Sequence, residues 1–209
     1  MALITKDLPK YGPVVPVIVI DKIEDALPLA GALLEGGIRV LEITLRTAVA
    51  LKAIELIAKE FPEAVVGAGT IRTTQDLKNA KDAGSQFCVS PGYTNQIGEA
   101  SKVHGLPLLP GVSTCSELMQ ANSDGFDFLK LFPAEVVGGI SLLKSWLSPF
   151  PDIIFCPTGG ITRDSAGNYL ALKNVVCVGG SWLTNSEILK QKDWKSIKEL
   201  AVEASKIRS

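Results

Sequence analysis

Short apolar, β-branched runs recur along this chain of 209 residues, and no other feature of the sequence constrains its fold as strongly. The runs occupy residues 14–20, 40–44, 64–68, 87–90, 106–109, 126–132, 153–156 and 175–178. Their centres lie about 19–26 residues apart, which is enough chain for a strand, a helix and two short loops. Nearly continuous apolar strands indicate burial on both faces, as in a parallel sheet.

Eight such units predict an α/β fold of the (β/α)8 type, the TIM barrel. Residues 51–60 show helical spacing of apolar positions, and a last helix is expected from residue 194 to about residue 206. A Rossmann sheet is disfavoured because no G-x-G-x-x-G motif follows the first run. No change of composition and no Pro/Gly/Ser-rich linker divides the chain, so we expect residues 1–209 to form a single domain.

Composition excludes several classes of function. The chain is 46% apolar and 21% charged with a net charge of −1, and its cations are scattered, so no nucleic-acid partner is expected. No apolar run approaches the roughly 18–20 residues of a membrane span, and residues 1–7 lack the features of a signal peptide. Cys88, Cys115, Cys156 and Cys177 show no close pairing, which favours reduced thiols in a cytoplasmic protein. With a single histidine and no paired thiolates, we expect no metal site.

Lys130 is the most informative single residue, because it interrupts the run 126–132 that otherwise predicts a buried strand. Lysine is almost never fully buried unless another group pairs with it or the protein uses it. Phenylalanine neighbours penalise the charged ammonium and so favour the free amine, which is the nucleophilic form. The first hypothesis is therefore an enzyme that forms a Schiff base at Lys130.

Glu42 is the second candidate catalytic residue. In the run 40–44 and the residues after it, Glu42, Thr44 and Arg46 share one face by strand alternation. A buried carboxylate needs a partner or a function, and in these barrels the chemistry lies at the C-terminal ends of the strands. A simple buried ion pair between Glu42 and Lys130 is the alternative.

Gly-Gly pairs follow the last two runs, at Gly159-Gly160 and at Gly179-Gly180, and Ser181 comes next. Turns at these two places form the usual phosphate site of such barrels, where backbone N–H groups and a helix N-terminus hold the anion. We therefore expect a phosphate site, and turns without a ligand are the alternative.

Four segments together resemble one known family: LEITLRT (41–47), GAGT (67–70), FLKLFPA (128–134) and PTGGI (157–161). They are similar to the 2-keto-3-deoxy-6-phosphogluconate (KDPG) aldolases, many of which also cleave 4-hydroxy-2-oxoglutarate. The resemblance extends from about Gly12 to Trp182. It implies a class I aldolase that acts on a small phosphorylated keto acid, needs no metal or other cofactor, and forms a homotrimer.

The resemblance also implies roles for individual residues. Lys130 corresponds to the Schiff-base lysine and Glu42 to the general acid/base, while Arg46 and Thr70 correspond to the groups that hold the keto-acid carboxylate. The other implied substrate-binding residues are Pro91 and Phe132 in the pyruvate pocket, Thr158 at the C4 hydroxyl, and Gly159, Gly160, Gly180 and Ser181 at the phosphate.

Three other functions remain open at this point. A phosphosugar isomerase or epimerase would need paired bases or a metal, and no central lysine. An aldolase for the phosphogalactonate epimer is possible, but the family's galactonate enzymes tend to have an apolar residue at the position of Thr158. A non-catalytic phosphometabolite-binding barrel would have no need of Lys130 and Glu42, which are both present.

Overall fold

The apolar runs form short parallel strands in the computed structural model, which describes residues 3–207. A six-stranded sheet has the order β5-β4-β3-β2-β1-β9, and a three-stranded sheet has the order β6-β7-β8. The strands are β1 (Val14–Ile18), β2 (Val40–Thr44), β3 (Val65–Gly69), β4 (Phe87–Val89), β5 (Leu108–Leu109), β6 (Gly111–Val112), β7 (Phe128–Leu131), β8 (Ile154–Phe155) and β9 (Val178–Gly180). The predicted α/β class with parallel strands is confirmed.

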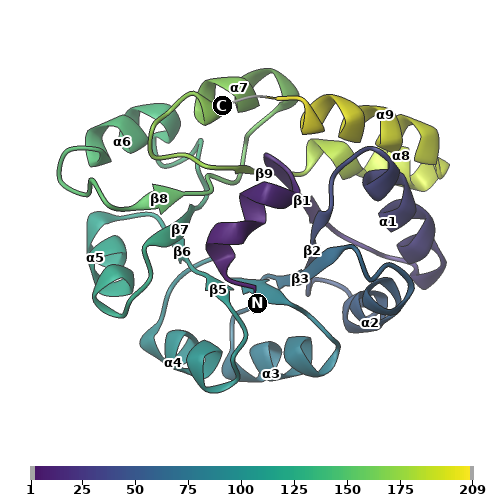
Figure 1. The fold of residues 1–209 in the computed structure, drawn as a ribbon, viewed down its shortest axis with the longest axis horizontal. Helices are drawn as coiled ribbons and strands as arrows, with labels where there is room; N and C mark the ends of the chain where they lie inside the picture. Colours follow the sequence, from purple (N-terminus) through teal and green to yellow (C-terminus); the bar gives the residue numbers. More distant parts are fainter. Residues whose placement is uncertain (1–2, 208–209) are drawn as a thin grey trace.

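Helices connect the strands and surround them on the outside (Figure 1). The α-helices are α1 (Ala26–Glu35), α2 (Ala50–Glu60), α3 (Thr74–Asp82), α4 (Asn95–Val103), α5 (Cys115–Ser123), α6 (Gly139–Trp146), α7 (Arg163–Leu170), α8 (Ser186–Gln191) and α9 (Trp194–Ser205). The predicted helix at residues 51–60 is α2, which buries Ala53, Ile54 and Ile57. The predicted last helix is α9, and Figure 1 shows it beside α1. Within residues 3–207, no helix combines the length and apolar character needed to cross a membrane.

Most strands differ from their predicted bounds by one to three residues, and two runs differ in more than their ends. The run 106–109 continues past Pro110 as β6, and the chain changes partners there, because β5 pairs with β4 whereas β6 pairs with β7. Proline has no N–H to donate, but its carbonyl accepts a hydrogen bond of 2.8 Å from the Lys130 N–H. At the last run, predicted at 175–178, β9 begins only at Val178 and includes two glycines that the sequence assigned to a turn.

The N-terminal 3-10 helix η1 (Thr5–Tyr11) precedes β1 and contacts the segments that lead into β2 and β7. Its Lys6 pairs with Asp127, which precedes β7, and the Tyr11 carbonyl accepts from the N–H of Arg39, which precedes β2. Leu8 of this helix is fully buried. The segment therefore covers the N-terminal ends of the strands, and their C-terminal ends face the opposite side.

Candidate active site

Lys130 lies within β7, and strand alternation directs it to the same face as Phe128 and Phe132. Only 4% of Lys130 is exposed, and its Nζ lies 5.1 Å from the centroid of the Phe132 ring. The register pairs Lys130 with Gly111 of β6, so no side chain from that position competes for the space beside it. The predicted burial of this amine next to an aromatic ring is confirmed.

Glu42 reaches Lys130 from β2, in the other sheet. The Glu42 carboxylate is 3% exposed, and its Oε1 lies 3.5 Å from Lys130 Nζ. Oε1 has no hydrogen-bond partner among the described residues. Gly69 of β3 lies beside this carboxylate, and a Cβ at that position would overlap it. The pair is therefore buried and close, while the carboxylate oxygen keeps a free lone pair for a third group.

Thr44 does not join this pair, although it lies on the same strand face. Its hydroxyl donates a hydrogen bond of 2.8 Å to the Ile18 carbonyl at the end of β1. Thr44 is fully buried, so its side chain ties β2 to β1 at the edge where the strands end. The shared face therefore contributes one catalytic candidate, Glu42, and one structural contact.

A cavity of about 180 Å³ adjoins Lys130. Seven of the residues that the sequence assigned to the site line it, which confirms that the fold brings them together. Two lining residues, Val17 and Ile161, were missed, because only the strand register and the loop path bring them to this place. Gly179 was expected only as a member of the second Gly-Gly pair, without a role of its own. The full lining is Val17, Arg46, Lys130, Phe132, Thr158, Gly159, Gly160, Ile161, Gly179 and Ser181.

Arg46 and Thr70 meet at the rim of this cavity. Arg46 is exposed in the loop after β2, and its Nε donates a hydrogen bond of 3.0 Å to Thr70 Oγ1. No carboxylate of residues 3–207 forms an ion pair with this guanidinium, which leaves its remaining N–H groups for an anion. Thr70 has φ of 62°, a left-handed conformation that costs a β-branched residue about 1–3 kcal/mol.

Only one of the two predicted Gly-Gly turns is present. Gly159 and Gly160 have φ of 101° and 81°, which is the turn conformation expected for them. Gly179 and Gly180 instead continue β9 and pair with β1, so the prediction of a second turn was wrong. Glycine is needed at both positions for steric reasons, because a Cβ on Gly179 would overlap Thr158 and a Cβ on Gly180 would overlap the Trp182 ring.

Four assigned residues do not line the cavity directly. Glu42 contacts the lining residue Lys130 through the ion pair, and Thr70 contacts the lining residue Arg46 through the hydrogen bond to its Nε. Gly180 lies one residue beyond the lining residue Gly179. Pro91 follows β4, and its carbonyl lies against Gly111, the partner of Lys130 in the register.

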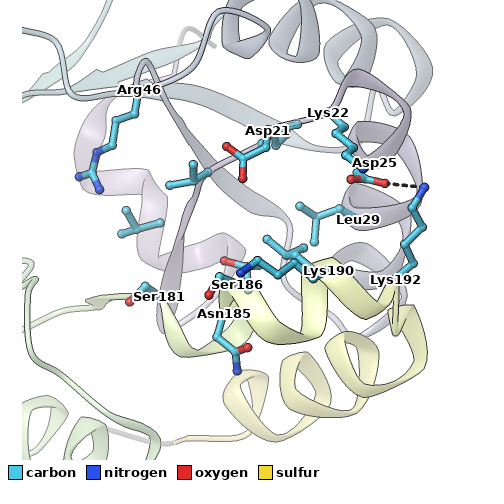
Figure 2. A pocket seen from close by; sticks show the side chains of 15 residues that line it. Asp21, Lys22, Asp25, Leu29, Arg46, Ser181, Asn185, Ser186, Lys190 and Lys192 are labelled. Carbon is cyan, nitrogen blue, oxygen red and sulfur yellow. Dashed lines mark ion pairs between the residues drawn. The ribbon is translucent and has the colours of Figure 1, made fainter.

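A larger cavity of about 520 Å³ lies next to the first and was not predicted from the sequence. Figure 2 shows its side chains, most of which come from the segment after β1 and from the segment that includes α8. Val17, Arg46 and Ser181 line both cavities. At its far side, Lys192 and Asp25 form an ion pair of 3.3 Å between the two segments. A second, larger cavity therefore adjoins the candidate site on its β1 side.

The cysteines match the prediction of free thiols. Cys88, Cys156 and Cys177 are buried, and Cys115 is exposed. Burial raises the pKa of the Cys88 thiol to about 12, so it stays protonated. Among residues 3–207, no cluster of three or more His, Cys, Asp or Glu side chains is arranged to hold a metal ion.

Comparisons with known proteins converge on one family. Residues 5–200 match the family model described as KDPG and KHG aldolase. The KHG/KDPG aldolase of Escherichia coli strain K12 is 51% identical over 193 residues, which cover 92% of this chain and 91% of that protein. The 2-dehydro-3-deoxy-phosphogluconate aldolase of Dickeya dadantii strain 3937 is 52% identical over 193 residues, with the same coverage of 92% and 91%.

A solved structure agrees with these sequence matches. The crystal structure of the KDPG aldolase from Legionella pneumophila holds pyruvate captured as a covalent carbinolamine intermediate. It superposes on this chain with a TM-score of 0.93 at 47% identity, and the match covers 95% of this chain and 96% of that one.

Proposed function

We propose that this chain, which belongs to the KDPG and KHG aldolase family, cleaves 2-keto-3-deoxy-6-phosphogluconate to pyruvate and glyceraldehyde 3-phosphate. It is a carbon–carbon lyase of the class I type, which works through a Schiff base. It also cleaves 4-hydroxy-2-oxoglutarate to pyruvate and glyoxylate. The observation that carries the proposal is the buried contact of 3.5 Å between Lys130 and Glu42, beside a cavity that ends at the Gly159-Gly160 turn.

Lys130 is the proposed nucleophile. Its neutral amine attacks the C2 ketone, and loss of water gives a protonated imine that serves as an electron sink. Removal of the C4-hydroxyl proton then breaks the C3–C4 bond, so the aldehyde leaves and the enamine of pyruvate remains. Protonation at C3 and addition of water to C2 release pyruvate and regenerate the amine.

Glu42 is the proposed acid/base for these proton transfers. Nζ becomes bonded to C2, so an oxygen 3.5 Å from Nζ is within reach of C3 and, directly or through one water, of the C4 hydroxyl. The same oxygen lacks a hydrogen-bond partner in the described residues, so it is free to accept the proton. One carboxylate thus serves both transfers.

The remaining assigned residues bind the substrate in this proposal. The guanidinium of Arg46, held by Thr70, binds the C1 carboxylate, and a planar fork suits that group. Pro91 and Phe132 enclose the pyruvate carbons, and Thr158 contacts the C4 hydroxyl. At the opposite end, the phosphate is bound by the backbone and hydroxyl donors of Gly159, Gly160, Gly180 and Ser181.

We also propose that the strands close into a complete (β/α)8 barrel as one domain over residues 1–209. Supporting this, β5 and β6 continue one another through Pro110, so the chain there touches both sheets. Isolated bridges of Phe155 with Val175 and of Thr158 with Gly179 support a junction between the two sheets on the other side. As in the sequence-based expectation, we propose a cytoplasmic homotrimer that needs no metal or other cofactor.

Borohydride trapping tests the reaction. The protein is incubated with pyruvate, reduced with borohydride and digested, and the modified peptide is identified by mass spectrometry. We expect a stable adduct on Lys130 that requires both pyruvate and borohydride, and cleavage of both keto acids by the untreated protein. Lys130→Met should lose the adduct, whereas Lys195→Met, at a lysine that is 85% exposed, should retain it. An adduct on a surface lysine alone, or none, would refute the Schiff-base proposal.

A further inference from the structure

The Glu135 side chain packs against the Gly159-Gly160 turn from the loop after β7. Its Cγ and Cβ lie 2.6 and 2.7 Å from the position that a Cβ on Gly160 would occupy. Its N–H donates to the Gly159 carbonyl at 3.1 Å, and the Ala134 N–H donates to the Thr158 carbonyl at 2.8 Å. Residues 134–135 therefore support the backbone of the turn along its whole length.

Tyr169 of α7 fixes the carboxylate of Glu135. The Tyr169 hydroxyl donates a hydrogen bond of 2.5 Å to Glu135 Oε1, and the tyrosine side chain is fully buried. Burial and this hydrogen bond to a carboxylate both raise the pKa of Tyr169, so the hydroxyl keeps its proton. Gly139 leaves the space that the hydroxyl needs, because a Cβ there would lie 2.5 Å from it. The orientation of Glu135 is thus set by a buried group on a different helix.

A carboxylate at this place has a consequence for an anionic ligand. Two negative charges a few ångströms apart repel, and the repulsion is larger where water is partly excluded. Glu135 is exposed and no cation among the described residues pairs with it, so Tyr169 is the group that restrains it. A free carboxylate could turn toward the N–H groups of the Gly159-Gly160 turn and compete with a phosphate for them.

We propose that Glu135 and Tyr169 are positioning residues that make the site selective for phosphorylated keto acids. They hold the Gly159-Gly160 turn in its shape and keep the Glu135 carboxylate away from the phosphate. This inference rests on the proposed function, because it assigns the phosphate to that turn. Neither residue touches the reacting carbons.

The test compares two substrates in one set of variants. 2-Keto-3-deoxy-6-phosphogluconate carries a phosphate and 4-hydroxy-2-oxoglutarate does not, so only the first depends on the turn. For Tyr169→Phe we expect KM for the phosphorylated substrate to rise about tenfold, as for loss of one hydrogen bond to a charged group. The kcat for that substrate, and both constants for 4-hydroxy-2-oxoglutarate, should change less than about twofold. The inhibition constant of inorganic phosphate should rise in parallel with KM for 2-keto-3-deoxy-6-phosphogluconate.

Two further variants separate positioning from general damage. Adding Glu135→Gln to Tyr169→Phe removes the unrestrained charge, so most of the lost affinity should return. The matched control is Tyr93→Phe, which breaks another hydroxyl–carboxylate hydrogen bond, of 2.6 Å to Asp124, at a place far from the turn. This control should leave the ratio of the two KM values unchanged. If Tyr169→Phe does not fold, Glu135→Ala tests the support of the turn alone, because it removes the Cγ that packs against Gly160. It should raise KM for the phosphorylated substrate selectively but by a smaller factor, and an unselective change would overturn the proposal.

Equal losses on both substrates, or none on either, would overturn the proposal for Glu135 and Tyr169. So would a double variant that recovers nothing. Failure of the proposed function has a different signature, because the unsubstituted protein would then form no borohydride-trapped adduct with pyruvate. A trapped adduct together with an unselective Tyr169→Phe variant refutes this inference alone.

Discussion

Replacement of Lys130 by methionine should destabilise the protein strongly, because it leaves the Glu42 charge buried without a partner. Methionine has a similar length and is apolar, so the change removes the cation with little change in volume. Glu42 is 3% exposed, and its Oε1 has no other polar partner within the described residues. The cost therefore comes from electrostatics rather than from a cavity.

The separation of the two charges sets the magnitude. At 3.5 Å and an effective dielectric constant of about 20, two unit charges attract by about 5 kcal/mol. That attraction offsets the desolvation of both groups, and after Lys130→Met the desolvation of Glu42 remains without compensation. We expect the free energy of unfolding to fall by about 3–5 kcal/mol. The double variant with Glu42→Gln should recover about 2–3 kcal/mol of this loss, since contacting residues are not additive.

Urea unfolding measures the effect in four proteins: the unsubstituted protein, Lys130→Met, Glu42→Gln and the double variant. Equal slopes of the four transitions show that their free energies of unfolding can be compared. Lys6→Met is the matched control, because Lys6 pairs with Asp127 at 2.5 Å but both side chains are nearly half exposed. It should cost less than about 1 kcal/mol. Additive effects of the two single changes would refute the reasoning, as would a loss for Lys130→Met no larger than that of the control.

Four further outcomes are expected. Lys130→Arg should abolish turnover and borohydride trapping, because a guanidinium is not deprotonated in proteins, and measurable pyruvate release would contradict this. Glu42→Gln should slow turnover by about 10²–10⁴-fold while an imine or carbinolamine still accumulates with pyruvate, and unchanged turnover would exclude the acid/base role. Thr70→Gly should raise the free energy of unfolding by about 1 kcal/mol by relieving its positive φ, and should raise KM for both keto acids; a less stable variant would argue against the strain. Burial tends to raise the pKa of Glu117, but hydrogen bonds from Ser113 and Thr114 outweigh burial and lower the pKa. The stability that the Glu117 carboxylate adds is therefore fully present above the unfolded-state pKa of about 4.3 and is lost as the pH falls through the lower pKa of the folded state. The difference in unfolding free energy between the unsubstituted protein and Glu117→Gln should therefore narrow in acid, and a constant difference would contradict the sign.

The proposed catalytic pair could be predicted from the sequence because both residues break a simple rule. A lysine and a glutamate inside apolar strand-forming runs each carry a desolvation cost that requires a partner or a function. Residue types and strand alternation were enough to find Lys130 and Glu42, and the structure places their charged atoms 3.5 Å apart. No knowledge of the loops was needed, because both residues lie within strands.

The two Gly-Gly pairs show where this reasoning stops. Gly159-Gly160 and Gly179-Gly180 are the same dipeptide, predicted to follow the last two strands, yet only the first adopts positive φ. The second is glycine because Thr158 and Trp182 occupy the space where side chains would be. That requirement depends on contacts between segments, which the local sequence does not encode.

The same limit explains the lining residues that were missed and the error at the fifth run. Val17 reaches the cavity because the register sets it opposite Glu42, and a shift of one residue would direct it to the other face. The chain at Pro110 passes from one strand partner to another, which depends on the path of its neighbours. Tyr169 and Glu135 are 34 residues apart, so their hydrogen bond was equally out of reach.

Three features that are costly for folding, the buried Lys130, the buried Glu42 and the positive φ of Thr70, lie around one cavity, and this coincidence argues for their role in a reaction. Replacing a buried ion pair by well-packed apolar residues is often neutral or stabilising, so the fold does not require Lys130 and Glu42. A glycine would adopt the conformation of Thr70 without strain, so the fold does not require a threonine there either. Each residue has a simpler substitute that serves folding alone, but no such substitute supplies an amine, a free carboxylate oxygen and a support for Arg46 at one place. The cost of keeping them therefore supports the catalytic role proposed for this site, since stability alone does not require them.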